Sequence, residues 1–399
     1  MPGVRRSVRA LALAAGLVLA SCSSGDDDAA DRAGLPPATT PARATSTTEP
    51  APAAPPALVA AERIDVPDVT GAAWRVTYMS QRVDGVPVEV TGLVVRPVGA
   101  APPGGFPVVA WGHGTIGVGD ACIQMNSFDG HLGIPALQQR LDAGYVVAAT
   151  DYEGIGGPGP HPYLVAESEA RSIFDIARVL PQIEGVDAST RVVLVGFSQG
   201  GHAVLAAAER RARLAPDLDV VGVAALATNG DLGESVRAIF RRRDLAEFGM
   251  LLAVGWGDTY PELEATDVIA PAGADAADAA RDGKCLGELQ PFLGDATVGD
   301  LWVQSPTALA PWVARVREND LHENAIDLPV FVAGGGDDPL AVPSSVNRLV
   351  ERLCGAGLAV DDHRYTGAGH GATVDASITD VHEWIAARFR GEVAPSSCA

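Results

Sequence analysis

Ser198 is the residue whose surroundings point most directly to chemistry. Residues 196–200 read Gly-Phe-Ser-Gln-Gly and directly follow the apolar run 192–195. In this G-x-S-x-G pattern, a sharp turn from a strand into a helix projects the serine hydroxyl from the carboxyl edge of a sheet. A serine becomes a good nucleophile only with a base beside it that an acid orients. The pattern predicts acyl transfer through Ser198, provided that an acid and a base follow in the chain.

An acid that could orient the base follows the apolar run 330–333. Residues 334–339 read Gly-Gly-Gly-Asp-Asp-Pro, so carboxylates stand on the loop directly after a late strand. That loop carries the orienting acid when the chain order is serine, acid, histidine. We choose Asp338, because Asp-Pro followed by an apolar stretch and Pro343 fits such a loop. Asp337 is the alternative.

Three histidines, His363, His370 and His382, come after the acid loop. His370 is flanked by glycines in a loop that reads Gly-Ala-Gly-His-Gly and precedes the last predicted helix. This is the position of the catalytic base in the serine, acid, histidine order. We assign His363 to a strand and His382 to a helix surface. The predicted triad is therefore Ser198, Asp338 and His370.

Backbone N–H groups near the serine could stabilise a developing oxyanion. A glycine-rich turn after the run at 108–111 brings one donor, from Gly114 or Thr115, and the residue after the nucleophile, Gln199, brings the other. We expect His113 to brace this turn by hydrogen bonds. We expect His202 to pack in the helix behind the serine.

The segments around these motifs predict a mostly parallel sheet flanked by helices. Residues 74–78 and 88–96 are typical of two antiparallel strands joined by a turn at Asp84-Gly85. Short continuous apolar runs are typical of strands buried on both faces, and they occur at 108–111, 145–149, 192–195, 220–226 and 330–333. Segments with helical periodicity, near Ile173, Val204 and Trp384, lie between these runs or after the last one. Alternating strands and helices predict an α/β fold.

About a hundred residues interrupt this alternation between the runs at 220 and 330. Residues 229–324 hold helical candidates at 234–243 and 245–254 and an Ala/Asp-rich piece at 272–282. We interpret them as a cap inserted into a core made of residues 58–228 and 325–399.

The N-terminal segment is typical of an export signal. Three arginines precede a short apolar run, and Leu-Ala-Ser-Cys ends it at Cys22. We interpret residues 1–21 as a lipoprotein signal peptide and Cys22 as the lipid-modified residue of an extracytoplasmic, membrane-anchored or secreted protein. Residues 22–57 are rich in Ser, Thr, Ala, Pro and Asp, and we expect a disordered tether there.

Four further cysteines are expected to form two disulfides in an oxidising compartment. We favour Cys354 with Cys398 and Cys122 with Cys285, among three possible pairings. None of their spacings suits a zinc site. The net charge of −21, with a single lysine, argues against a nucleic-acid partner.

Taken together, the motifs resemble the secretory lipase family, a group of α/β-hydrolases related to a yeast lipase A. The matching segments are residues 110–115, 150–154, 196–202 and 367–371. Among them Asp-Tyr-Glu-Gly at 151–154 is the most family-specific. The resemblance implies a triacylglycerol lipase or carboxylesterase whose helical cap covers the acyl-binding site.

The expected chemistry is hydrolysis of a neutral, lipid-like ester through an acyl-enzyme, with no metal or cofactor. Two other functions are considered. A proline-directed aminopeptidase or amidase on the same fold would need a carboxylate pair in the cap, for which Glu262 and Glu264 are candidates. A non-catalytic, lipid-anchored binding protein would not need Ser, Asp and His in the right order.

Overall fold

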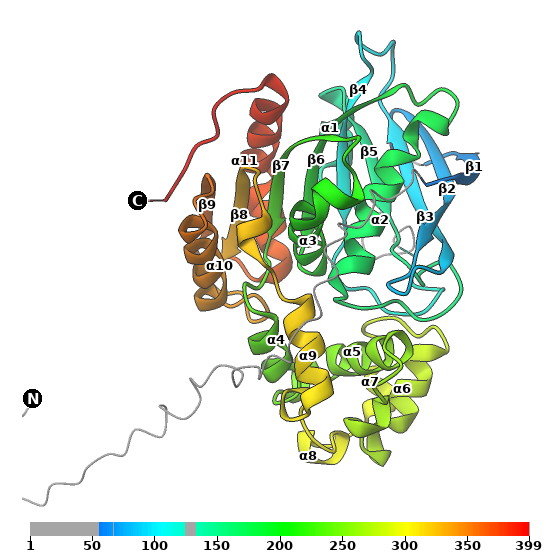
Figure 1. Cartoon of the computed structure of the whole chain (residues 1–399), viewed down its shortest axis with the longest axis vertical. Helices are drawn as coiled ribbons and strands as arrows, with labels where there is room; N and C mark the ends of the chain where they lie inside the picture. Colours follow the sequence, from blue (N-terminus) through cyan, green and yellow to red (C-terminus); the bar gives the residue numbers. More distant parts are fainter. Residues whose placement is uncertain (1–55, 67, 124–132, 399) are drawn as a thin grey trace, which may run out of the picture. The chain divides into compact units, whose positions relative to one another are not determined.

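The computed structural model describes residues 56–66, 68–123 and 133–398. These residues belong to one compact unit, Thr45–Ala399. A nine-stranded sheet, in the order β1-β2-β3-β5-β4-β6-β7-β8-β9, runs through the described part (Figure 1). Strands β4 to β9 pair in parallel with one another, whereas the pairs β1–β2, β2–β3 and β3–β5 are antiparallel. The prediction of a mostly parallel α/β sheet is confirmed.

The strands lie close to where the apolar runs predicted them. They are β1 (Leu58–Ile64), β2 (Ala72–Gln81), β3 (Pro87–Arg96), β4 (Phe106–Gly112), β5 (Val146–Thr150), β6 (Ala188–Phe197), β7 (Asp219–Leu226), β8 (Val330–Gly335) and β9 (Val360–Tyr365). The sequence analysis missed β1, because this edge strand exposes most of its side chains and has no continuous apolar run.

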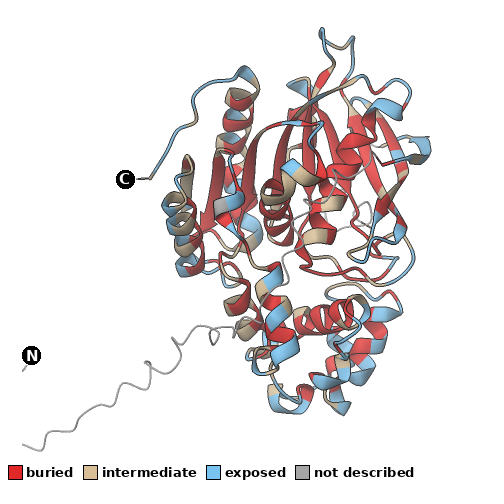
Figure 2. Cartoon of the chain, viewed as in Figure 1, coloured by how far each residue is buried: buried red, intermediate tan, exposed pale blue. Residues whose placement is uncertain are grey.

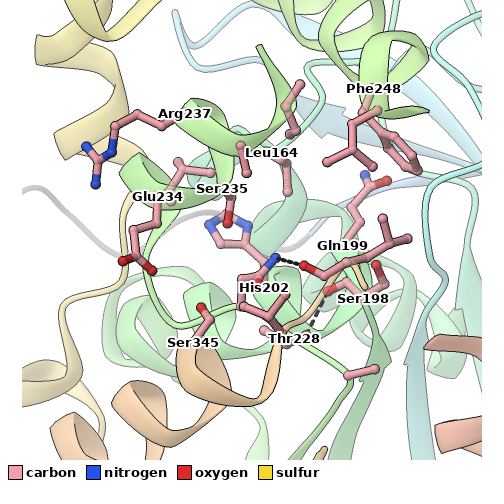
Figure 3. A pocket seen from close by; sticks show the side chains of 18 of the residues that line it. Leu164, Ser198, Gln199, His202, Thr228, Glu234, Ser235, Arg237, Phe248 and Ser345 are labelled. Carbon is pink, nitrogen blue, oxygen red and sulfur yellow. Dashed lines mark hydrogen bonds between the residues drawn. The ribbon is translucent and has the colours of Figure 1, made fainter. Parts of the chain in front are cut away.

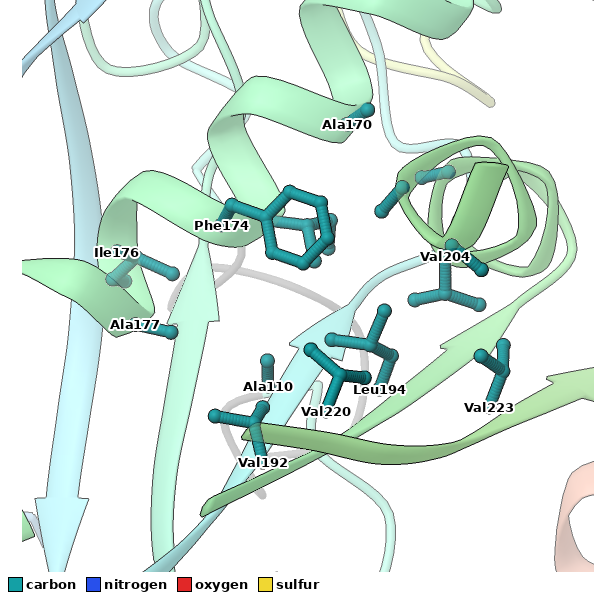
Figure 4. Packing of buried hydrophobic residues seen from close by; sticks show 14 of the residues in the cluster. Ala110, Ala170, Phe174, Ile176, Ala177, Val192, Leu194, Val204, Val220 and Val223 are labelled. Atoms are coloured by element: carbon teal, nitrogen blue, oxygen red, sulfur yellow. The ribbon is translucent and has the colours of Figure 1, made fainter. Parts of the chain in front are cut away.

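Side chains that alternate along each strand build two cores, one on each face of the sheet. Val192 and Leu194 of β6 join the core beneath α2 (Ala166–Arg178) and α3 (Gln199–Leu214) (Figure 4). Val193 and Val195 point to the opposite core. Strand β6 is therefore buried on both faces, which holds its carboxyl end and the residue that follows it in a fixed position.

Three further helices complete the two layers. α10 (Pro343–Gly355) adds to the core beneath α2 and α3. α1 (Leu137–Asp142) and α11 (His370–Arg390) cover the other face. With helices on both faces of the sheet, a ligand is expected at the carboxyl ends of the parallel strands. The sequence analysis did not predict α1 or α10.

The segment between β7 and β8, which includes the predicted insertion, consists mainly of helices. Its α-helices are α4 (Leu232–Ile239), α5 (Ala246–Thr259), α6 (Ala274–Arg281), α7 (Gln290–Leu293), α8 (Val298–Leu301) and α9 (Ala310–Asn319). They gather together below the sheet in Figure 1, and their inward sides are buried (Figure 2). The inserted helices thus have a small core of their own.

Both disulfides that we favoured are present. Cys354–Cys398 ties the C-terminal tail to α10, with Cα atoms 5.5 Å apart. Cys122–Cys285 joins the insertion to the loop after β4. The N–H of Leu286 also donates to the carbonyl of Ile116 at 2.8 Å. The insertion is therefore fastened to the loop that continues from the predicted oxyanion turn.

The predicted signal peptide, the predicted lipidation site Cys22 and almost all of the predicted tether lie outside the described residues. Among the helices that the structure describes, none combines the length and the apolar character needed to cross a membrane.

Candidate active site

Ser198 stands at a sharp turn between β6 and α3. Its backbone lies at φ 55° and ψ −115°, a region that residues with side chains rarely adopt. Its N–H donates to the carbonyl of Leu226 at 2.8 Å. Its own carbonyl accepts hydrogen bonds from the N–H of His202 and the hydroxyl of Thr228. This strained backbone is held by the neighbouring strand and by the first turn of the helix.

Two glycines make the turn possible, because their backbones approach other backbone atoms too closely for a side chain. A Cβ on Gly196 would collide with the carbonyl group of Gly200. A Cβ on Gly200 would collide with the carbonyl oxygen of Gly112 and lie 2.8 Å from that of His113. The turn after β4 is thereby packed directly against the turn that carries Ser198.

The structure brings the three predicted triad residues together. His370 Nε2 lies 2.8 Å from Ser198 Oγ, and His370 Nδ1 lies 2.8 Å from Asp338 Oδ2. With Nδ1–H donating to the carboxylate, Nε2 carries the lone pair that can accept the serine proton. The sequence predicts His370 in the loop before the last helix, but it is the first residue of that helix, α11. The contacts expected with Ser198 and the acid are still made.

Asp338, and not Asp337, faces the histidine. The carboxylate of Asp338 is fully buried, and its Oδ1 accepts hydrogen bonds from the N–H groups of Leu340 and Ala341 at 2.8 and 2.9 Å. Asp337 is exposed. The backbone donors use one oxygen of Asp338 and leave the other for His370, so the carboxylate has a single orientation.

The candidate donors for the predicted oxyanion hole, the backbone N–H groups of Gln199 and either Gly114 or Thr115, have no hydrogen-bond acceptor within the described part of the chain. Gln199 is the first residue of α3, so its N–H has no partner in the helix. Gly114 is buried against the ring of Phe197. Because buried backbone donors are nearly always paired, unpaired ones beside Ser198 are suited to a ligand oxygen.

His113 braces the turn that holds Gly114. Its ring is buried, and its Nδ1 lies 2.7 Å from the carbonyl oxygen of Gly114. Burial lowers the pKa of His113, so the ring is a neutral donor to this carbonyl. The hydroxyl of Tyr152 donates to the carbonyl of His113 at 3.3 Å.

A buried polar cluster lies behind the nucleophile turn, and the sequence analysis missed most of it. Glu169 of α2 bonds to His202 and to the side chain of Gln199. His161 contacts the same Gln199 amide. His202 packs behind the turn, as we expected, but as a partner of Glu169. One signal could have revealed Glu169: it stands four residues before Ile173, on the apolar face of its helix.

A cavity of about 380 Å³ opens onto Ser198, Gln199 and His370. Figure 3 shows Ser198 and Gln199 on one side of it and Glu234 and Arg237 on the other. Its apolar lining comes from both the core and the insertion and comprises Leu164, Ala227, Leu232, Ala238, Ile239, Leu245, Phe248, Leu321, Pro339, Leu340 and Val342. Gly114, Thr115 and Asp338 are not among the lining residues.

Charged side chains stand at the far side of the cavity. Glu234 is paired with Arg348, and Asp320 accepts a hydrogen bond from the N–H of Leu232. Among the described residues, no group of three or more histidine, cysteine and carboxylate side chains is arranged to hold a metal ion.

Relatives by sequence match about a third of the chain. Over 131 residues it is 34% identical to a probable inactive lipase of Mycobacterium tuberculosis, and over 132 residues it is 28% identical to lipase A of Moesziomyces aphidis. Each match covers 32% of this chain, and the matches span 28% and 26% of the length of the two relatives.

Solved structures match most of the fold. Lipase A of Candida antarctica superposes with a TM-score of 0.72 at 17% identity, covering 86% of this chain and 84% of that one. A rice cell wall degrading esterase, LipA of Xanthomonas oryzae, gives 0.66 at 22% identity, covering 84% and 97%. These likenesses confirm the α/β-hydrolase fold.

The family model described as secretory lipase matches residues 123–397, which include all three triad residues. The predicted resemblance is therefore confirmed: the chain belongs to the secretory lipase family.

Proposed function

We propose that this protein is a serine carboxylic-ester hydrolase, a lipase or carboxylesterase. The observation that carries the proposal is the continuous pair of 2.8 Å contacts from Asp338 through His370 to Ser198 Oγ, at the wall of a cavity. Membership of the secretory lipase family supports the same reaction class.

In the proposed reaction, Ser198 Oγ attacks the ester carbonyl while His370 Nε2 takes its proton. Asp338 holds the imidazole in the correct tautomer and stabilises the imidazolium that forms. The imidazolium then protonates the departing alcohol, which leaves Ser198 acylated. Water repeats the sequence on the acyl-enzyme, releasing the acid and restoring the serine.

The negative charge on the substrate oxygen would be stabilised by backbone donors. Gln199 supplies one N–H, and Gly114 or Thr115 supplies the other. Preorganised donors of this kind contribute strongly because they need no reorganisation as the charge develops. Their lack of any other acceptor among the described residues supports this assignment.

The proposed substrate is a neutral ester with an apolar, lipid-like acyl group. Apolar side chains of the core and of residues 229–324 line the same cavity, among them Leu164, Ile239 and Phe248. We propose that the insertion acts as a cap and that these side chains contact the acyl chain. Such a cavity excludes water and favours apolar groups.

The aminopeptidase alternative finds less support. Glu262, one of the candidate carboxylates, bonds to Arg315 and does not line the cavity, and neither does Glu264. The acids that do line it, Glu234 and Asp320, have partners of their own. The binding-protein alternative would not need the aligned side chains of Ser198, Asp338 and His370.

We also propose that the protein acts outside the cytoplasm, secreted or held at the membrane through a lipid on Cys22. Two disulfides suit an oxidising compartment. The family's description as secretory agrees with this location.

The test of the proposed function is a panel of p-nitrophenyl esters from acetate to palmitate. The full chain, produced in an oxidising compartment, is expected to hydrolyse them with a single preferred chain length. Ser198→Ala should reduce the rate to background, while Ser189→Ala, at the other end of β6, should keep it. Folded, disulfide-bonded protein that cleaves no ester would contradict the proposal, and aminoacyl amides would be the next substrates.

A further inference from the structure

Glu169 is a buried carboxylate that does not contact the triad. Both of its oxygens nevertheless form hydrogen bonds, one of them to Gln199, the residue next to Ser198. Oε1 accepts hydrogen bonds from the N–H of Leu164 at 3.0 Å and from Nε2 of Gln199 at 2.8 Å. Oε2 lies 2.8 Å from His202 Nδ1. The side chain has no exposed surface. A buried charge is costly unless it is paired and fully hydrogen-bonded, so this geometry is closely specified.

His202 provides the opposite charge. Its Nδ1 faces Glu169, and its Nε2 faces the carbonyl oxygen of Asn319 at 2.8 Å. Both ring nitrogens meet acceptors, so both carry protons. Burial alone would disfavour the charge, but the hydrogen bond and the negative charge of Glu169 outweigh it and raise the pKa of His202. Glu169 and His202 therefore form a buried ion pair.

The amide of Gln199 is held from two sides. One N–H of Nε2 donates to Glu169, and the other donates to Nε2 of His161 at 2.6 Å. His161 can accept because its Nδ1–H donates to the carbonyl of Glu153 at 2.9 Å. Burial lowers the pKa of His161 to about 4, so the ring stays neutral and keeps this lone pair. The side chain of Gln199 is fixed while its own backbone N–H is left unbonded.

The other proposed oxyanion donor is held by the same stretch of chain. Tyr152 donates to the carbonyl of His113, and its ring stacks on His161 with centroids 5.3 Å apart. The hydroxyl of Thr115 donates to the hydroxyl of Tyr163 at 3.0 Å. Residues 152–169 thus contact both sides of the proposed oxyanion hole, and Glu169 is the carboxylate of this stretch that bonds to the side chain of Gln199.

The last helix of the insertion joins the same cluster. Asn319, at the end of α9, accepts a hydrogen bond from the N–H of Ala166 through Oδ1 and donates to Tyr260 through Nδ2. Its carbonyl is the acceptor for His202. The position of the cap and the position of Gln199 are therefore set by one hydrogen-bonded network.

We propose that Glu169 is a positioning residue for ester hydrolysis: it fixes Gln199 so that the backbone N–H of Gln199 points at the oxyanion. The proposal rests on the proposed function and adds a residue that does not touch substrate. Its effect should fall on the transition state, because the oxyanion forms only there. Losing a whole oxyanion donor costs on the order of a hundred- to a thousand-fold in rate, so a misplaced one should cost roughly ten- to a hundred-fold.

The experiment compares Glu169→Ala, Glu169→Gln and Asp175→Ala with the wild-type full chain. Asp175 is the matched control: it is a buried acid on the same helix, bonded to Ser80 and away from Gln199. Glu169→Gln keeps an acceptor oxygen toward Leu164 and Gln199 and offers an N–H to a neutral His202. The values measured are kcat and KM on the preferred p-nitrophenyl ester, with the urea midpoint of each variant.

We expect Glu169→Ala to lower kcat roughly ten- to a hundred-fold with KM changed less than about three-fold. Glu169→Gln should recover kcat to within about three-fold of the wild type, because the hydrogen bonds to Gln199 remain. Asp175→Ala should lower the urea midpoint and leave kcat unchanged. If Glu169→Ala and Asp175→Ala lose stability alike and keep kcat, Glu169 is only structural and the proposal is overturned.

Gln199→Met gives a second measurement that does not depend on the folding of Glu169→Ala. It removes the amide but keeps the backbone N–H, the chain length and the ion pair of Glu169 with His202. We expect the same loss in kcat as for Glu169→Ala, whereas an unchanged kcat would overturn the proposal. A wild-type protein without esterase activity would overturn both this proposal and the proposed function, and an active wild type with unaffected variants would overturn this one alone.

Discussion

Replacing Asp338 with asparagine is expected to lower kcat by about ten-thousand-fold while the fold and KM stay close to the wild type. One oxygen of the carboxylate accepts a hydrogen bond from Nδ1–H of His370 at 2.8 Å, and the other accepts hydrogen bonds from two backbone N–H groups. An asparagine can turn its NH₂ toward the histidine, which favours the tautomer with the proton on Nε2. That tautomer cannot accept the proton of Ser198.

The neighbouring aspartate supplies the control. Asp337→Asn makes the same chemical change one residue away, at an exposed side chain, and should keep kcat within about two-fold because surface substitutions away from a site have small effects. The pair is measured on one ester, with circular dichroism to check the fold. A large loss in Asp337→Asn and a small one in Asp338→Asn would reverse our assignment of the acid.

Replacing Gly200 with alanine should lower kcat/KM by about a hundred-fold or more, although the change adds one methyl group. That group would collide with the carbonyl oxygen of Gly112 and lie 2.8 Å from that of His113. Both are backbone atoms of the turn before Gly114, so one of the two turns must move. A shift of about 1 Å at a reacting centre is enough for a loss of this size.

Gly371→Ala is the matched control for this substitution. Gly371 follows His370 in the first turn of α11, and nothing lies within 4 Å of the position its Cβ would take. Alanine there should keep kcat/KM and raise the free energy of unfolding by up to about 1 kcal/mol. The two variants are compared by ester hydrolysis and urea unfolding. Equal losses of activity in the two variants would show that the collision between the two turns does not explain the need for glycine at position 200.

The parallel strands and the nucleophile could be predicted from the sequence because they depend on local pattern. A strand buried on both faces needs a continuous apolar run, such as 192–195 in β6. A serine that follows such a run and is flanked by glycines is typical of a nucleophile turn. The edge strand β1 lacks this signal, since it has only one neighbouring strand and all its residues except the two at its ends are exposed.

The loop pattern favours Asp338 but leaves Asp337 open as the alternative. Both stand on one loop, and which carboxylate points inward depends on the backbone hydrogen bonds of that loop. Disulfide pairing was open for a similar reason, since four cysteines allow three pairings. The fold decides the pairing, because it brings Cys285 next to Cys122 although 163 residues separate them in the sequence.

The cluster around Glu169 was hidden for a different reason. Its members come from the loop before α2, from α2, from α3 and from α9, so no spacing in the sequence brings them together. The motif around Ser198 predicts a role for the backbone N–H of Gln199 and says nothing of its side chain. A carboxylate on the apolar face of a helix is the kind of local signal that should be followed when an adjacent nucleophile has been found.

If Ser198 is an activated nucleophile, it should react covalently with diethyl p-nitrophenyl phosphate. Attack of Ser198 Oγ on phosphorus would expel p-nitrophenolate and leave a diethyl phosphate ester on the serine. We expect one p-nitrophenolate per protein molecule, a single modified peptide containing Ser198 by mass spectrometry, and loss of ester hydrolysis in the same proportion. The Ser198→Ala variant should show neither the modified peptide nor the stoichiometric release of p-nitrophenolate. Stable, folded protein that hydrolyses esters while Ser198 stays unlabelled would show that Ser198 is not the nucleophile.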